Sequence, residues 1–128
     1  MKRRLLPAAL VLLLASCASS GSQTGTSHNR NVISADEIAG VSATTAGDIV
    51  HKLRPNWLRS RGPVSASRNT PEVAIIYIDD VRSSDAGALD RIPSQIVHEI
   101  RFLSGSDATT LYGMGHGGGA ILVRTTRR

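Results

Sequence analysis

The fold of this chain is decided by the stretch Val73-Ala74-Ile75-Ile76-Tyr77-Ile78-Asp79-Asp80-Val81. The run before the aspartates is continuous, apolar and rich in β-branched residues, which predicts a strand covered on both faces. Paired carboxylates also invite a catalytic or metal-binding interpretation. A turn explains Asp79 and Asp80 better, because Asp side chains bond nearby backbone N–H groups and adjacent residues of a tight turn point apart.

Two further strands are expected downstream of this stretch. Residues 98–103 alternate polar and apolar, which predicts a half-buried strand with Glu99 and Arg101 facing outward. Residues 120–125 are apolar and β-branched and are predicted to form the last strand.

Two short helices are predicted before the strands. Ser34-Ala35-Asp36-Glu37 has the form of a capping box, so a helix is expected to continue to about Gly40. Thr44 or Thr45 can cap a second helix, which Pro55 ends because the residue before a proline is pushed out of the helical region. Its apolar residues recur at helical spacing and are Ala46, Ile49, Val50 and Leu53.

A third helix is expected between the last two strands. Ser106 or Asp107 can cap it over residues 108–112, and Gly113 closes it as a C-terminal glycine. Gly105 and Gly113 are both expected to have a positive φ. Together these elements predict an α+β fold with a small mixed β-sheet and short helices.

The N-terminus has the pattern of a secretory signal. Three basic residues precede the apolar stretch 5–15, which is shorter than the roughly 20 residues that span a bilayer. Leu14-Ala15-Ser16-Cys17 follows and resembles the lipobox of bacterial lipoproteins, in which the cysteine becomes the lipidated first residue. We therefore expect residues 1–16 to be a lipoprotein signal peptide. Cys17 is the only cysteine of the chain, so no intramolecular disulfide is expected.

Lipidation of Cys17 implies a location at a membrane surface. One acyl chain contributes about 0.8 kcal/mol per CH₂ and binds only marginally, whereas the several chains of the lipoprotein family, palmitate among them, imply a stable anchor. Ala18 stands where an aspartate favours inner-membrane retention in the enterobacterial pattern. The lipobox resemblance thus implies the cell outer membrane, with the protein on its periplasmic face.

The rest of the chain divides into two parts. Residues 17–31 are polar and read as a flexible tether, and residues 32–128 have enough apolar residues for one small domain. The chain has 15 basic and 10 acidic residues, and removal of residues 1–16 takes away three basic residues, which leaves 12 − 10 = +2. This small excess excludes the electrostatic pattern of a nucleic-acid-binding protein.

Four motifs occur in an order that resembles the plug domain of TonB-dependent outer-membrane receptors. In that family they are a V-Y-I-D-G-V hairpin, an I-E-x-I-E-V-L-x-G strand, an S-A-x-x-Y-G turn and a G-G-V-I-x-I-x-T strand. Residues 73–125 carry the resemblance well, and residues 34–58 carry it loosely. The motifs of this chain are Tyr77-Ile78-Asp79-Asp80-Val81, Ile96-Val97-His98-Glu99-Ile100-Arg101-Phe102-Leu103-Ser104-Gly105, Ala108-Thr109-Thr110-Leu111-Tyr112-Gly113 and Gly118-Gly119-Ala120-Ile121-Leu122-Val123-Arg124-Thr125.

Two departures from the family matter for function. Asp80 stands where the family has glycine, which is tolerable because Asp adopts the left-handed conformation more readily than most residues. The family continues into a large barrel, whereas the sequence to Arg128 offers about four strands, too few for the smallest outer-membrane barrel of about eight. We therefore expect a stand-alone plug-like domain and do not carry transport over with the resemblance.

The resemblance and the lipobox together imply a non-enzymatic protein-interaction or accessory module, linked to outer-membrane transport through its partner. The partner implied is an outer-membrane barrel receptor or a periplasmic energy-transducing protein, and no cofactor is expected. The loops 58–71 and 113–119 are the expected contact regions.

A small-ligand-binding lipoprotein, with an anion or a saccharide as ligand, is the alternative function. Its candidate residues are Arg59, Arg61, Arg68 and His116. The loop with the three arginines is interpreted either as an anion-binding patch or as a solvated segment without a binding role. His116 is expected to be exposed in a glycine-rich loop. Metal binding is not expected, because the four histidines show no i, i+4 pair. A hydrolase is the weakest hypothesis, since no G-x-S-x-G elbow occurs.

Overall fold

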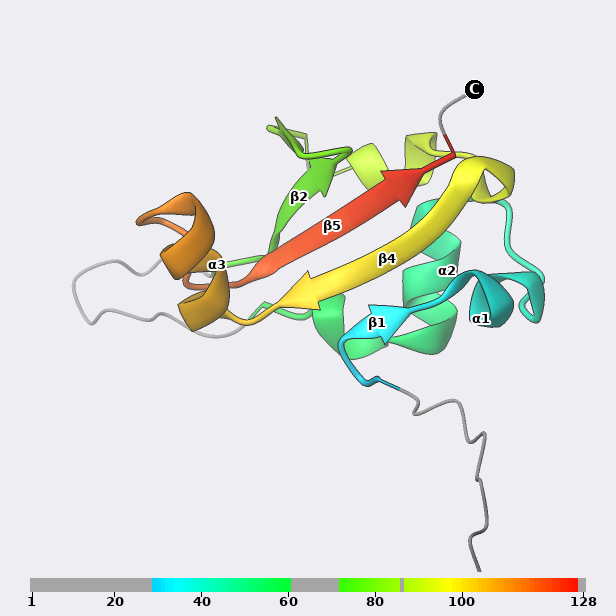
Figure 1. Cartoon of the computed structure of the whole chain (residues 1–128), viewed down its shortest axis with the longest axis horizontal. Coiled ribbons are helices and arrows are strands. Elements are labelled where there is room, and N and C mark those ends of the chain that lie inside the picture. The colour runs from blue at the N-terminus through cyan, green and yellow to red at the C-terminus, as the bar shows by residue number, and fades with distance from the viewer. Residues whose placement is uncertain (1–28, 61–71, 86, 127–128) are drawn as a thin grey trace, which may run out of the picture.

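The structure is a computed structural model that describes residues 29–60, 72–85 and 87–126. Over these residues the chain forms a mixed α/β fold, with a five-stranded sheet and short helices (Figure 1). The predicted small mixed sheet with short helices is confirmed at this level. The signal peptide and nearly all of the tether lie outside the described residues. Within them, no helix has the length and apolar character needed to cross a membrane.

The sheet has the strand order β1-β4-β5-β2-β3. β2 and β5 pair in parallel, and the other neighbours pair antiparallel. β5, the last described strand, lies between β4 and β2 at the centre of the sheet (Figure 1). The strands are β1 (Val32–Ile33), β2 (Ile75–Ile78), β3 (Val81–Ser83), β4 (Val97–Leu103) and β5 (Ala120–Thr125).

The predicted turn between β2 and β3 is confirmed. Asp79 and Asp80 have φ angles of 46° and 68°, and Ile78 pairs with Val81 across them. A two-residue hairpin loop with positive φ at both positions is a type I′ turn, whose twist matches that of the flanking strands. Aspartate tolerates this conformation better than most residues do.

The helices begin mainly where the capping residues predict. Both capping boxes form, one between Ser34 and Glu37 and one between Thr45 and Asp48. The prediction for the third helix is wrong by two residues, because Ser104 is its N-cap and accepts the backbone N–H of Asp107. The helices are α1 (Ala35–Ala39), α2 (Ala46–Leu53) and α3 (Gly105–Tyr112), with the 3₁₀ helices η1 (Pro55–Leu58), η2 (Ala88–Arg91) and η3 (Ser94–Ile96).

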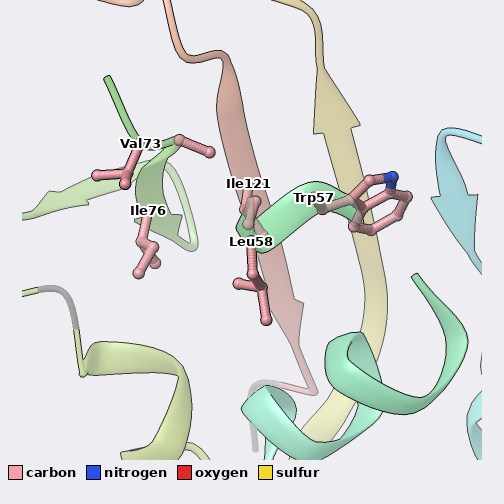
Figure 2. A pocket seen from close by; sticks show the side chains of 6 residues that line it. Trp57, Leu58, Val73, Ile76 and Ile121 are labelled. Atoms are coloured by element: carbon pink, nitrogen blue, oxygen red, sulfur yellow. The ribbon is translucent and has the colours of Figure 1, made fainter. Parts of the chain in front are cut away.

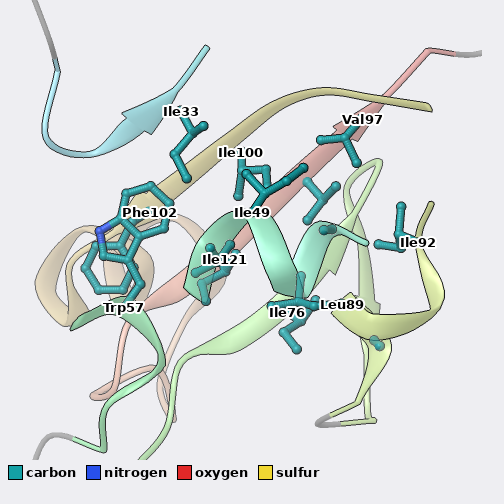
Figure 3. Close-up of a cluster of buried hydrophobic side chains, with 14 residues drawn as sticks. Ile33, Ile49, Trp57, Ile76, Leu89, Ile92, Val97, Ile100, Phe102 and Ile121 are labelled. Atoms are coloured by element: carbon teal, nitrogen blue, oxygen red, sulfur yellow. The ribbon is translucent and has the colours of Figure 1, made fainter. Parts of the chain in front are cut away.

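The main core lies between one face of the sheet and the segments α1, α2, η1 and η2 (Figure 3). Trp57 of η1 stacks on Phe102 of β4, with ring centroids 5.5 Å apart. Full burial of an aliphatic side chain stabilises a fold by about 1.5–3 kcal/mol, so this aliphatic layer dominates the stability of the domain. The largest fully buried side chains are Ile33, Ile49, Val50, Ile100, Ile121 and Val123.

The opposite face of the sheet is covered by α3 at one end. The strand register places Tyr77, Leu122 and Arg101 in one row on this face, because directly paired residues point to the same side. Ala108 of α3 packs here against Tyr77 and Ala120 as a second, smaller cluster. The predicted outward orientation of Glu99 and Arg101, away from the main core, is confirmed by this register.

The glycines around α3 allow segments of backbone to pass close together. A Cβ on Gly118 would lie 2.5 Å from the carbonyl oxygen of Val73, and one on Gly105 would collide with the carbonyl of Gly117. Gly113 has the predicted positive φ of 87°, whereas Gly105 does not, so that expectation is wrong for Gly105. These contacts fix the α3–β5 loop (residues 113–119) against β2 and the start of α3.

Candidate functional site

The α3–β5 loop folds around a buried histidine. His116 is only 3% exposed, so the expectation of an exposed residue is wrong. Its ring lies against two tyrosines, with centroid distances of 6.0 Å to Tyr77 and 5.7 Å to Tyr112. Sequence reasoning missed this burial because Tyr77 lies on β2, 39 residues away along the chain.

Both ring nitrogens of His116 have partners within the protein. Nδ1 lies 2.8 Å from the carbonyl oxygen of Gly113, and Nε2 lies 2.8 Å from the hydroxyl of Tyr77. A carbonyl oxygen only accepts, so Nδ1 carries the proton and donates it. In the neutral ring Nε2 then accepts the hydroxyl proton of Tyr77. His116 therefore joins the loop to the sheet.

The two tyrosines beside His116 form a tight stack. Their ring centroids lie 4.2 Å apart. Burial raises the pKa of Tyr112, and the negative charge of Asp80 adds to the rise while Arg124 opposes it. This shift moves the titration of the Tyr112 hydroxyl further above neutral pH.

The outer side of the same region exposes apolar side chains. Met114 is 95% exposed in the α3–β5 loop, and Leu111 is 66% exposed near the end of α3. Gly113 and Gly115 flank Met114 with φ angles of 87° and 94°. The loop thus has a buried polar anchor and an exposed apolar tip.

The predicted arginine patch is only partly described. Arg59 is exposed directly after η1, whereas Arg61 and Arg68, like Cys17, lie outside the described residues. η1 packs on the face of the sheet that carries the main core, whereas His116 lies on the opposite face. The structure therefore does not bring Arg59 and His116 together.

A hollow of about 180 Å³ lies beside η1 (Figure 2). Among the described residues its walls are apolar, with no charged side chain that would bind an anion. Ligand pockets usually measure about 300–1,000 Å³, so this hollow is small for a saccharide. The residues that line it are Trp57, Leu58, Val73, Ala74, Ile76 and Ile121.

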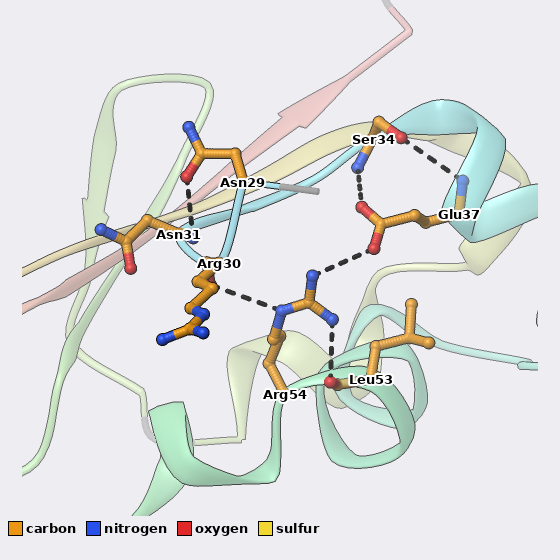
Figure 4. Close-up of polar contacts among 7 residues, drawn as sticks. All are labelled: Asn29, Arg30, Asn31, Ser34, Glu37, Leu53 and Arg54. Carbon is orange, nitrogen blue, oxygen red and sulfur yellow. Dashed lines mark hydrogen bonds and ion pairs between the residues drawn. The ribbon is translucent and has the colours of Figure 1, made fainter. Parts of the chain in front are cut away.

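Arg54 is engaged in a half-buried network rather than in an anion site (Figure 4). It forms an ion pair of 3.0 Å with Glu37, and the two side chains are 13% and 15% exposed. Glu37 also accepts the backbone N–H of Ser34 at 3.0 Å. Arg54 donates further to the carbonyls of Leu53 and Arg30. The network ties the N-cap of α1 to the end of α2.

The side chain of Asp79 bonds to Thr125 of β5, the strand next to β2 in the sheet. Its carboxylate accepts the backbone N–H of Thr125 at 2.9 Å and the Thr125 hydroxyl at 2.6 Å. The hairpin turn is thereby fastened to the end of β5. Over the described residues, no group of three or more His, Cys, Asp or Glu side chains is arranged to hold a metal ion.

Comparisons of the chain with protein-family models, with curated proteins and with solved structures find no match. These comparisons therefore add no support to the resemblance to the plug domain.

Proposed function

We propose that this chain is a lipoprotein anchored to the outer membrane through Cys17, facing the periplasm, whose plug-like domain acts as a non-enzymatic protein-interaction module. The observation that carries the proposal is the exposed apolar tip of the α3–β5 loop on a well-packed domain. Methionine and aromatic residues are enriched at the cores of protein interfaces, and Met114 is exposed in a loop whose segment is closed by the bond from His116 to Gly113.

The strand order supports the plug-like part of the proposal. The four motifs that carry the resemblance fall on the adjoining strands β3, β2, β5 and β4 and on α3. A barrel receptor or a periplasmic energy-transducing protein is the proposed partner.

The engagement of the polar side chains supports binding over catalysis. His116 is bonded to Tyr77 and Gly113, and Asp79 is bonded to Thr125. Groups held in this way maintain the fold, whereas a catalytic acid or base must reach a substrate within hydrogen-bond distance.

Affinity purification of the full-length lipoprotein from solubilised outer membrane tests this function. We expect an envelope protein to be retained in a fixed ratio and to be displaced by added soluble domain (residues 29–128). Retention of no envelope protein, or retention that excess soluble domain leaves unchanged, would contradict the proposal.

Small-ligand binding is the second candidate, and the hollow beside η1 favours an apolar ligand over the anion or saccharide expected from the arginines. A thermal-shift screen separates the two functions, because a ligand that binds the folded state raises the melting temperature. Stabilisation by a small molecule would favour the binder.

A further inference from the structure

We propose that Met114 is a modification site, at which a hydroperoxide reversibly oxidises the thioether to a sulfoxide while the domain stays folded. The inference goes beyond the proposed interaction function and does not depend on it, because it concerns the chemistry of one side chain and needs no partner protein. Three features of the α3–β5 loop support it. They are the exposure of the Met114 side chain, the glycines on either side of it, and the hydrogen bonds that fix the loop without it.

The sulfur of Met114 is open to solvent. Among the described residues, Met114 is the most exposed large apolar side chain, at 95%. The other methionine of the chain is Met1, which belongs to the proposed signal peptide, so the processed protein would contain Met114 alone. The indole of Trp57, another group that oxidants attack, is 3% exposed. Because oxidation of sulfur follows exposure, a small oxidant should act mainly on this one atom.

The reaction is a two-electron transfer of oxygen. The thioether sulfur attacks one oxygen of the hydroperoxide, and the O–O bond breaks as the S–O bond forms. The proton of the attacked oxygen passes to the leaving oxygen, which departs as water or as an alcohol. The sulfur is oxidised and the peroxide is reduced. Methionine sulfoxide reductases reverse the change with two thiols, which become a disulfide while the sulfoxide oxygen leaves as water.

The backbone around Met114 leaves room for both the oxidant and a reductase. Gly113 and Gly115 flank the residue with φ angles of 87° and 94°. A Cβ at either position would meet no atom within 4 Å beyond its chain neighbours. A reductase must enclose the oxidised side chain in its active site, and glycines place no side chain in its way. The sulfoxide would therefore be accessible in the folded protein.

The hydrogen bonds that hold the loop do not involve the Met114 side chain. The N–H of Gly113 donates to the carbonyl of Thr109 at 2.9 Å, and the N–H of Gly119 donates to the carbonyl of His116 at 2.8 Å. The imidazole of His116 also bonds to the Gly113 carbonyl. A new polar group lowers stability when folding removes it from water. At Met114 folding removes almost none of the side chain from water, so the sulfoxide should leave the melting temperature unchanged.

Treatment of the full chain with hydrogen peroxide, followed by tryptic peptide mapping, tests the proposal. Cleavage after Arg101 and Arg124 releases a peptide in which Met114 is the only sulfur-containing residue. Leu89→Met supplies a matched control within the same molecule, because Leu89 is 3% exposed and methionine nearly conserves its volume. In this variant we expect oxygen uptake at position 114 to be about tenfold faster than at position 89.

The wild-type chain provides the remaining measurements. Position 114 should be oxidised at a similar rate in the folded chain and in the urea-unfolded chain, and the oxidised protein should keep its melting temperature. A methionine sulfoxide reductase with a dithiol should then restore the thioether without unfolding. Met114→Leu should take up no oxygen in the same peptide, which verifies the assignment.

Other results would overturn the proposal. Oxidation at position 114 that is tenfold slower in the folded wild-type chain than in the unfolded one would refute an accessible sulfur, whether or not Leu89→Met folds. A fall in the melting temperature of oxidised wild type would show that the fold depends on the thioether. A sulfoxide that the reductase removes only after unfolding would refute reversibility. None of these results bears on the proposed interaction function.

Discussion

At the scale of single residues, His116 carries the link between the α3–β5 loop and the sheet. One nitrogen holds the Gly113 carbonyl and the other holds the Tyr77 hydroxyl, and Tyr77 is itself buried. A substitution that removes both bonds therefore leaves the buried Tyr77 hydroxyl without a hydrogen-bond partner. An unpaired buried hydroxyl lowers the stability of the fold more than an unpaired exposed hydroxyl, which can bond to water.

We expect His116→Leu to lower the free energy of unfolding by about 1–3 kcal/mol, since it leaves the Tyr77 hydroxyl without a hydrogen-bond partner. His116→Asn places an amide nitrogen near the position of Nδ1 and should retain the bond to Gly113. Hydrogen exchange of the Gly119 amide, which donates to the backbone carbonyl of residue 116, should accelerate in His116→Leu and stay closer to wild type in His116→Asn. Equal exchange in both variants would show that the ring acts by volume alone.

Asp79 and Asp80 are a matched pair of substitution sites for testing the hydrogen bonds to Thr125, because only Asp79 makes them. Asn tolerates positive φ as Asp does, so Asp79→Asn changes the acceptor pair while it keeps the backbone conformation. It should cost about 1–2 kcal/mol of stability in urea denaturation, because the bond from the Thr125 N–H loses its charged acceptor and the Thr125 hydroxyl must accept from the amide instead of donating to a carboxylate. Asp80→Asn, at the exposed position of the same turn, should cost much less. Similar losses at both positions would argue against the Thr125 contact.

At the scale of elements, local capping signals predict the helices well and tertiary contacts explain the errors. Both N-terminal capping boxes form because each involves only four consecutive residues. The start of α3 could not be read locally, since Ser104, Ser106 and Asp107 are all good caps. The fit of Gly105 against the Gly117 carbonyl is a tertiary contact that the sequence does not show.

β1 illustrates the same limit for strands. It contains two residues, Val32 and Ile33, and exists because they pair with Arg101 and Ile100 of β4. So short a segment has no periodicity to recognise. The candidate site could not be predicted from the sequence either, because the burial of His116 depends on Tyr77, which lies on a strand distant in the sequence.

The capping box of α2 predicts how acid affects stability. Backbone N–H groups of Thr44 and then Thr45 donate to Asp48 and lower its pKa below the ordinary 3.8. A lowered pKa means that the folded state favours the carboxylate, so this contribution is present at neutral pH and is lost as pH falls through the folded-state pKa.

We therefore expect Asp48→Asn to lower the melting temperature at neutral pH, and the difference from wild type to shrink as the pH falls through the folded-state pKa of Asp48. Asp36→Asn is a suitable control, because it also removes a first-turn carboxylate but leaves the Ser34–Glu37 box of α1 intact. A melting-temperature difference for Asp48→Asn that persists unchanged at low pH would contradict a charge-dependent cap.

At the scale of the whole molecule, the proposed lipid anchor determines where the domain can meet a partner. An anchor on Cys17 would lie twelve residues before the first described residue, Asn29. The anchor thus confines the domain to proteins at the same membrane surface.

Cys17→Ala should move the protein from the membrane fraction to the soluble periplasmic fraction, since acyl chains supply the anchoring free energy. The melting temperature of the isolated domain should not change, because the substitution lies outside it. Immunoblots of fractionated cells measure the first effect. A variant that stays fully in the membrane fraction would contradict lipidation at this cysteine.

The central position of β5 has a consequence for export. The strand that joins β4 to β2 is the last one along the described chain, so the two halves of the sheet, β1-β4 and β2-β3, cannot join until residues 120–125 are present. Pairings between distant segments form slowly, because the intervening chain must first be closed into a loop. A chain that crosses a membrane with its N-terminus leading would therefore not complete its sheet before residues 120–125 have been synthesised.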